Sequence, residues 1–301
     1  MSALACLWQR DGRPDAGEAL ARMQRALAIY GRHGNRTRDD GAIAFGVCLD
    51  VRRPEDRFDR QPVEGGGGRY VAMADARLDN RPELGDMLGI EPSRLDAMPN
   101  SALVLAAWER WQAEAIDRLV GDFAFVVWDS GERVLHLARD PVGFRPLFYH
   151  LTPGRVAVAS MVKGLHALPD IPRAPDMDRM RDFLALAPQH GSASYFADIH
   201  RVEQGQHVTI HADGRVDRRA WYGWGKDSET RPLGRPEDHA EELRAILDRA
   251  VRDRVRGVDG LAAHLSAGLA SAAVVSSAAL ARAAEGKRLT AYTSVPMAGA
   301  E

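Results

Sequence analysis

Residues 121–139 read GDFAFVVWDSGERVLHLAR. The two runs in this stretch, 123–128 and 134–138, have the length of β-strands and are apolar except for His136, which is typical of strands covered on both faces. Asp129 to Arg133 between them are turn-forming or charged residues. The stretch therefore predicts a β-hairpin inside a layered fold.

Similar signals extend to either side of the hairpin. Gly65–Gly68 and Asp213-Gly214 predict turns. Three segments have apolar residues at helical spacing, and the last of them follows an Asp at an N-cap position: 16–30, 102–111 and 178–186. Further strands are expected at 43–49, 69–73, 156–159 and 207–211. Residues 1–222 therefore read as one α+β domain.

The composition changes after residue 222. Residues 223–235 are rich in Gly, Pro and charged side chains, which is typical of a linker. Beyond it the pattern predicts a helix over 236–256, a strand over 261–265, an Ala-rich helix to residue 284 and a strand over 288–294. This order opens a parallel α/β domain. Two strands make an incomplete parallel sheet, so we expect residues 236–301 to be part of a truncated domain.

Overall composition excludes several classes of protein. The 301 residues carry 40 basic and 42 acidic side chains, a formal net charge of -2, which predicts no nucleic-acid partner. No apolar run has the roughly 18–20 residues that span a bilayer, and the N-terminus does not resemble a secretory signal. Two cysteines, Cys6 and Cys48, cannot form a disulfide framework, and buried inert thiols are expected. These features predict a soluble cytoplasmic protein.

The strongest local motif is HLSAGLAS, residues 264–271. A turn of small residues between a strand and a helix exposes backbone N–H groups at the helix N-terminus, where the helix dipole favours a phosphate. Ser266 and Ser271 add hydroxyl donors. By itself the motif also fits a plain strand-to-helix turn.

Together with three other segments, the motif resembles the asparagine synthetase superfamily. The loop is similar to that family's pyrophosphate loop, Ser-Gly-Gly-Leu-Asp-Ser, and the other segments occur in the family's order: 76–84 (ARLDNRPEL), 121–129 (GDFAFVVWD) and 138–149 (ARDPVGFRPLFY). The resemblance implies a glutaminase-type Ntn-hydrolase domain with αββα layers. It also implies an ATP pyrophosphatase domain of the adenine nucleotide α-hydrolase type, which forms amides through an acyl-adenylate.

The glutaminase half departs from the family pattern. Ser2 stands where the family has its nucleophilic Cys, whose freed α-amine is the base. The family's glutamine-binding Arg, Asn-Gly-Glu and Asp align with Phe45, Asp75-Ala76-Arg77 and Ser101. These replacements predict a silent glutaminase domain. Arg139, Asp140 and Arg145 are expected to form ion pairs that brace the hairpin.

The ATP half has its own departure. The resemblance implies ATP and Mg²⁺, but the family's loop Asp is Ala270, whose methyl group can neither bind a metal nor accept a hydrogen bond. No metal ligand is therefore predicted from the loop. The nucleotide-contacting residues implied are seven: Leu265, Ser266, Ala267, Gly268, Leu269, Ser271 and Ser294.

A synthetase with a silent glutaminase must take its amine from the substrate. This resembles the β-lactam synthetase and lasso-peptide cyclase branches, and the run 289–296 (LTAYTSVP) is most similar to the cyclases. The function implied is ATP-dependent peptide macrocyclisation on a precursor peptide, or amide formation on a small molecule. Two alternatives stay open. One is a glutamine-hydrolysing asparagine synthetase, and the other is a non-catalytic module that binds a protein partner.

Overall fold

A computed structural model describes residues 1–188, 191–223 and 234–295. The chain divides into two units, residues 1–51 with 55–227 and residues 52–54 with 228–301. Within the described residues no helix combines the length and the apolarity that crossing a bilayer requires.

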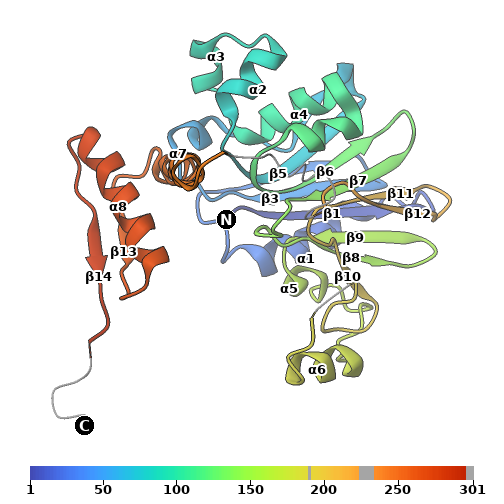
Figure 1. Cartoon of the computed structure of the whole chain (residues 1–301). Helices are drawn as coiled ribbons and strands as arrows, with labels where there is room; N and C mark the ends of the chain where they lie inside the picture. Colours follow the sequence, from blue (N-terminus) through green and yellow to red (C-terminus); the bar gives the residue numbers. More distant parts are fainter. Residues whose placement is uncertain (189–190, 224–233, 296–301) are drawn as a thin grey trace. The chain divides into compact units, whose positions relative to one another are not determined.

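The first unit contains two six-stranded sheets (Figure 1). The first sheet has the strand order β10-β8-β9-β1-β3-β2, and the second has the order β12-β11-β7-β6-β5-β4. The first sheet comprises β1 (Ala3–Gln9), β2 (Asn35–Asp39), β3 (Ile43–Cys48), β8 (Phe148–Leu151), β9 (Arg155–Ala159) and β10 (Ile199–Arg201). The second comprises β4 (Val63–Gly65), β5 (Tyr70–Leu78), β6 (Gly121–Asp129), β7 (Val134–Arg139), β11 (Gln206–His211) and β12 (Val216–Ala220). The predicted hairpin is confirmed as the antiparallel pair β6–β7.

Helices cover the outer faces of both sheets. On the side of the first sheet lie α1 (Ala16–Leu27), α5 (Val162–Leu165) and α6 (Met177–Leu184); on the side of the second lie α2 (Arg81–Leu88), α3 (Pro92–Asp96) and α4 (Asn100–Trp111). Short 3-10 turns are η1 (Pro54–Phe58), η2 (Gly66–Gly68) and η3 (Gln112–Arg118). Asp176 caps α6 by accepting the N–H groups of Asp178 and Arg179, as the sequence predicted.

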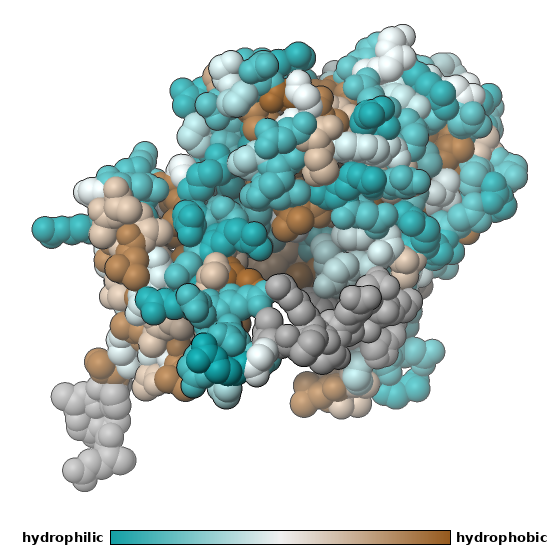
Figure 2. Space-filling view, turned by 45° about the horizontal axis from the view of Figure 1, so that its top comes forward, coloured by the Kyte–Doolittle hydropathy of each residue, from teal (hydrophilic) through white to brown (hydrophobic). Residues whose placement is uncertain are grey.

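Three apolar clusters hold these layers together. One lies between the sheets and contains Trp8, Phe45 and Trp128. A second joins the second sheet to α4 through Trp108, and a third joins the first sheet to α1. The layer order is therefore αββα. The side chains of β5 alternate between the first two clusters because successive strand residues point to opposite faces. With the apolar clusters inside, hydrophilic side chains dominate the face drawn in Figure 2.

Gly121, at the start of β6, is required by its surroundings. Its φ is +143°, and a Cβ there would lie 2.0 Å from the carbonyl oxygen of Arg77. A side chain fits neither the backbone conformation nor the space. This close approach sets the register of β5 against β6, in which Asp122 stands opposite Arg77.

The second unit contains α7 (Pro236–Val255), β13 (Ala262–His264), α8 (Leu269–Ala284) and β14 (Thr290–Tyr292). β13 and β14 pair in parallel, with α8 as the crossover between them. Val251, Val255 and Ala278 form its small core. The four elements expected from the sequence are thus present. Most of the predicted linker, 224–233, lies outside the described residues.

Candidate functional site

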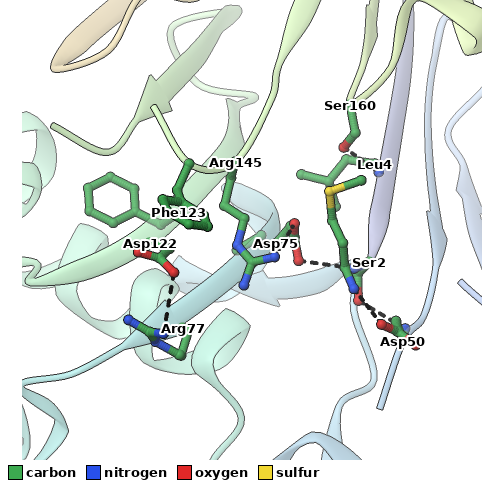
Figure 3. A network of polar contacts seen from close by, with 12 residues as sticks. Ser2, Leu4, Asp50, Asp75, Arg77, Asp122, Phe123, Arg145 and Ser160 are labelled. Atoms are coloured by element: carbon green, nitrogen blue, oxygen red, sulfur yellow. Dashed lines mark hydrogen bonds and ion pairs between the residues drawn. The ribbon is translucent and has the colours of Figure 1, made fainter. Parts of the chain in front are cut away.

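The Ser2 region lies where the start of β1 meets the ends of β3 and β5 (Figure 3). The main-chain N–H of Ser2 donates to Asp75 Oδ1 at 3.0 Å, and its hydroxyl accepts the N–H of Asp50 at 3.1 Å. The α-ammonium of Met1 forms an ion pair with Asp50. The Asp75 carboxylate therefore binds the backbone of Ser2, while the Asp50 carboxylate binds the α-ammonium of the preceding residue.

Asp75 is the most perturbed group of this cluster. Burial raises its pKa to about 6, against the opposing effects of Arg145, the chain's ammonium and the Ser2 N–H. Arg145 Nη1 lies 3.5 Å from Asp75 Oδ2, and that oxygen has no hydrogen-bond partner within the described residues. The contact with Arg145 is too long for a charge-assisted hydrogen bond, so desolvation outweighs it.

Arg77 is engaged on the same strand. It donates to both oxygens of Asp79 at 2.9 and 2.8 Å, and its Nη1 lies 3.4 Å from Asp122. Burial raises the pKa of Asp122, while Arg77 and Arg145 oppose the rise. The guanidinium groups near Ser2 are thus already matched with carboxylates.

Ser101 belongs to a separate buried cluster. Its hydroxyl donates to Asp59 Oδ1 at 2.8 Å, and the Gln61 amide donates to Asp59 Oδ2 at 2.9 Å. The same Gln61 side chain exchanges two hydrogen bonds with the main chain of Ala74, next to Asp75. Asp59 and Gln61 could not be predicted from the sequence, because they follow no strand or motif signal.

Phe45, Cys6 and Cys48 are all buried in the first unit. Phe45 lies inside the core opposite Cys6 in the β1–β3 pairing, and Asp50 rather than Phe45 contacts Ser2. Cys6 and Cys48 are buried, as predicted. Burial raises the pKa of both thiols, that of Cys48 to about 11, so neither is a ready thiolate.

The expected ion pairs of the hairpin are only partly present. Arg145 pairs with Asp75, but Arg139 donates to backbone carbonyls. Asp140 instead accepts four backbone N–H groups, at 3.0–3.2 Å. These come from Phe123, Val142, Phe144 and Arg145. The prediction was wrong for Asp140 because the backbone around the turn after β7 directs four N–H groups at its carboxylate.

In the second unit, residues 266–271, called the 266–271 loop below, comprise the turn before α8 and the first residues of that helix. The Ser266 and Ser271 hydroxyls lie 2.8 Å apart, and Ser266 Oγ also accepts the Gly268 N–H at 3.2 Å. Ser271 donates to the carbonyls of Ser266 and Gly268. The loop is held by its own hydroxyls at the N-terminus of a 16-residue helix.

The other predicted nucleotide residues lie near this loop. Leu265 follows β13 and donates its N–H to Tyr292 O at 2.8 Å, while Thr293 Oγ1 donates to Leu265 O at 2.8 Å. Ser294 follows β14 on the same edge, since the strands are parallel. Ala267 and Leu269 are loop and first-turn residues that offer backbone groups. Ala270 supplies no ligand, and within the described residues no group of three His, Cys, Asp or Glu side chains could hold a metal.

Residues 1–222 match the family described as glutamine amidotransferase domain. The chain is 29% identical to a putative glutamine-hydrolysing asparagine synthetase of Mycobacterium bovis over 280 residues, 86% of this chain and 42% of that protein. Asparagine synthetases 3 and 1 of Bacillus subtilis are 27% and 26% identical, over 71% and 87% of this chain and 34% and 41% of their own lengths. The chain therefore spans about two fifths or less of these relatives.

The fold has solved counterparts. A glutamine phosphoribosylpyrophosphate amidotransferase from B. subtilis superposes with a TM-score of 0.52 at 14% identity, covering 96% of this chain and 65% of that chain. At this identity the likeness concerns the fold, which is that of an Ntn-type glutamine amidotransferase.

Proposed function

Because the chain belongs to the glutamine amidotransferase domain family and is related to asparagine synthetases, we propose that it serves ATP-dependent amide formation with a glutaminase domain that is silent. The observation that carries the proposal is that one chain contains both a carboxylate-rich Ser2 cluster and a strand–loop–helix–strand unit suited to a phosphate. The first disfavours glutamine, and the second favours ATP.

Glutamine would meet the wrong charges at Ser2. Its α-carboxylate needs a cation, yet the Asp75 carboxylate binds the Ser2 N–H, and the cations nearby are already matched. The Met1 ammonium pairs with Asp50, and Arg77 pairs with Asp79 and Asp122. An unpaired carboxylate brought next to another is strongly disfavoured in a buried site. Ser2 also has a hydroxyl where the family's thiol reacts, and a hydroxyl needs a stronger base.

The 266–271 loop has the features of a phosphate site. Two hydroxyls and the N–H groups at the start of α8 gather at one helix end, where the dipole adds to their attraction for an anion. Leu265 and Ser294 stand at the carboxyl ends of parallel strands, the edge at which open α/β sheets bind ligands. ATP fits this arrangement. Magnesium is a weaker expectation, because Ala270 removes the one carboxylate expected in the loop.

The proposed reaction has two steps. A substrate carboxylate attacks the α-phosphorus of ATP, the bond to the β-phosphate oxygen breaks, and pyrophosphate leaves. A substrate amine then attacks the acyl carbon, AMP leaves with the bond electrons, and the amine's proton passes to solvent. The chain's part in the first step is to hold the pyrophosphate oxygens at the loop. Closure of a peptide's Asp or Glu side chain onto its own N-terminal amine is the reaction we propose, at a cytoplasmic location.

The test combines two assays on the full chain. A synthetic peptide with a free N-terminal amine and an internal Asp or Glu is incubated with ATP and Mg²⁺, and pyrophosphate release and loss of one water from the peptide are measured. We expect both with the unaltered protein, and less with Ser271→Ala, while Ser276→Ala on the exposed side of α8 is the matched control. Ammonia release from glutamine without pyrophosphate release would instead identify a glutaminase.

A second candidate, binding of a protein partner without catalysis, is favoured by one observation. Large apolar side chains of the second unit are exposed: Leu243, Ile246, Leu280 and Tyr292. Sedimentation velocity of the purified chain at several concentrations tests whether this surface associates with copies of itself. Pyrophosphate release with the peptide would reject the non-catalytic function.

A further inference from the structure

Two histidines and a threonine lie together on one face of the second sheet. His136 of β7 stands directly opposite Thr209 of β11 in their antiparallel pairing. His207 lies two residues before Thr209 on β11, so these two side chains point to the same face of the sheet. Trp108 of α4 lies against both imidazoles, with its ring centroid 4.7 Å from that of His136 and 6.1 Å from that of His207. Strand pairing thus brings three donor side chains side by side.

The three donor atoms form a nearly regular triangle. His136 Nδ1 and His207 Nε2 are 3.1 Å apart, and Thr209 Oγ1 lies 3.5 Å from the first and 3.4 Å from the second. Hydrogen bonds of a hydroxyl are typically shorter than about 3.2 Å, so hydrogen bonding does not account for the position of Thr209. A tetrahedral ion with bonds of about 2.0–2.1 Å holds neighbouring ligand atoms about 3.3–3.4 Å apart. The triangle therefore has the dimensions of one face of a tetrahedral metal site.

Both imidazoles are in the protonation state that binds metals. Burial lowers the pKa of His136 to about 4 and that of His207 to about 3, so both rings are neutral at pH 7. Neutral imidazole is the form that ligates a metal ion, and no proton has to be displaced before it does so. His207 is 5% exposed, whereas His136 and Thr209 are only partly buried. An ion therefore reaches the triangle from the side of His136 and Thr209.

The charges that act on the two rings are of both signs. After burial, Asp129 has the next largest effect on His136 and raises its pKa, while His211 lowers it. For His207 the charges of His136 and Arg219 lower the pKa further. Asp129 thus opposes Arg219, and the binding of a divalent ion depends mainly on the ligand bonds themselves.

We propose that His136 Nδ1, His207 Nε2 and Thr209 Oγ1 bind one divalent first-row transition-metal ion in tetrahedral geometry, for which Zn²⁺ is the best fit. Imidazole nitrogens suit zinc, and solvent takes the fourth position. The second nitrogen of each ring, His136 Nε2 and His207 Nδ1, then carries the proton. The bound ion joins β7 to β11.

The experiment is titration of the full chain, first freed of metal with a chelator, with Zn²⁺ by calorimetry and with Co²⁺ by visible absorption. We expect one Zn²⁺ per chain and the intense visible bands of tetrahedral Co²⁺. His136→Gln and Thr209→Val should each weaken Zn²⁺ binding at least about tenfold, because even loss of an outer-shell partner costs that much. His239→Gln, at an exposed histidine of α7, is the matched control and should leave the affinity unchanged.

Three results would overturn the proposal. They are absence of saturable Zn²⁺ binding, a Co²⁺ complex with only the faint bands of the six-coordinate ion, and equal affinities in Thr209→Val and His239→Gln. Should His136→Gln not fold, Thr209→Val still decides the matter, because valine has the shape of threonine and replaces only a partly exposed hydroxyl. The Co²⁺ spectrum of the unaltered protein needs no variant at all.

Discussion

The N–H of Ser2 and the Oδ1 atom of Asp75 meet at 3.0 Å although 73 residues separate them along the chain. The contact joins the two sheets, since Ser2 precedes β1 and Asp75 lies in β5. It also places a buried carboxylate at the point where the family has its reactive residue. The charge state of Asp75 therefore affects the stability of the first unit.

Asp75→Asn is expected to stabilise the first unit at neutral pH. The pKa of Asp75 is raised in the folded state to about 6 from an ordinary 3.8. The folded state therefore holds the proton more tightly, and stability falls as pH rises from about 4 to 6. Roughly two pKa units at about 1.4 kcal/mol each give a gain of up to about 3 kcal/mol at pH 7.

The measurement is denaturant unfolding followed by tryptophan fluorescence. All six tryptophans lie before residue 228, so the signal reports on the first unit. At pH 4 the variant and the unaltered protein should be nearly equally stable, because Asp75 is then protonated. Destabilisation by Asp75→Asn at pH 7 would show that the Arg145 contact outweighs burial.

A buried histidine pair predicts loss of stability in mild acid. His136 Nδ1 and His207 Nε2 lie 3.1 Å apart beside Trp108. Burial lowers the pKa of His136 to about 4 and that of His207 to about 3. Both are neutral in the folded state and protonated in the unfolded chain below about pH 6.5, so stability is lost as pH falls through that window.

The loss between pH 7 and pH 5 should be about 2 kcal/mol for each histidine. His207→Gln removes one of the two titrating groups and should flatten the pH dependence while lowering stability at pH 7 through lost packing. Urea unfolding at several pH values gives the slope. An unchanged slope in this variant would mean that other groups cause the acid sensitivity.

Asp140→Ala should be among the most destabilising single changes in the first unit. Asp140 is 1% exposed and accepts four backbone N–H groups. Removing the carboxylate leaves these donors unsatisfied, at about 1–3 kcal/mol for each one that water cannot reach. We expect a loss of about 4 kcal/mol in tryptophan-monitored unfolding.

Asp140→Asn is the informative companion, since its amide keeps only one acceptor oxygen. It should fall between Asp140→Ala and the unaltered protein. If both variants unfold like the unaltered protein, the turn after β7 does not depend on this carboxylate.

Arg282→Met should loosen the second unit alone. Arg282 is 1% exposed, and it donates to the carbonyls of Val258 and Asp259, both at 2.5 Å. A methionine fills similar space but leaves both carbonyls without this donor, a cost of about 2 kcal/mol. Hydrogen–deuterium exchange should rise in α7 and α8 peptides, with tryptophan fluorescence unchanged. Arg249→Met, at an exposed position of α7, is the control and should alter neither.

The local patterns were enough to predict much of the fold. Apolar runs, interrupted in β7 by His136, predict β3, β6, β7 and β9, because a strand buried on both faces is mostly apolar. The same reasoning does not predict β1, although its seven residues are all buried, or β2, which has no buried residue. An edge strand such as β2 is defined by its pairing with β3 and carries no signal of its own.

Local sequence patterns are sufficient to predict the loop before α8, the buried hairpin and the family resemblance, because each depends on residues close together along the chain. The surroundings of Ser2 depend on tertiary packing, since Asp50 follows β3 and Asp75 lies in β5. Tertiary packing alone placed His136, His207 and Thr209 side by side beneath Trp108, and it assigned Asp140 to backbone N–H groups in place of Arg139. Contacts of this kind follow from how sheets and helices pack, which short sequence patterns do not encode.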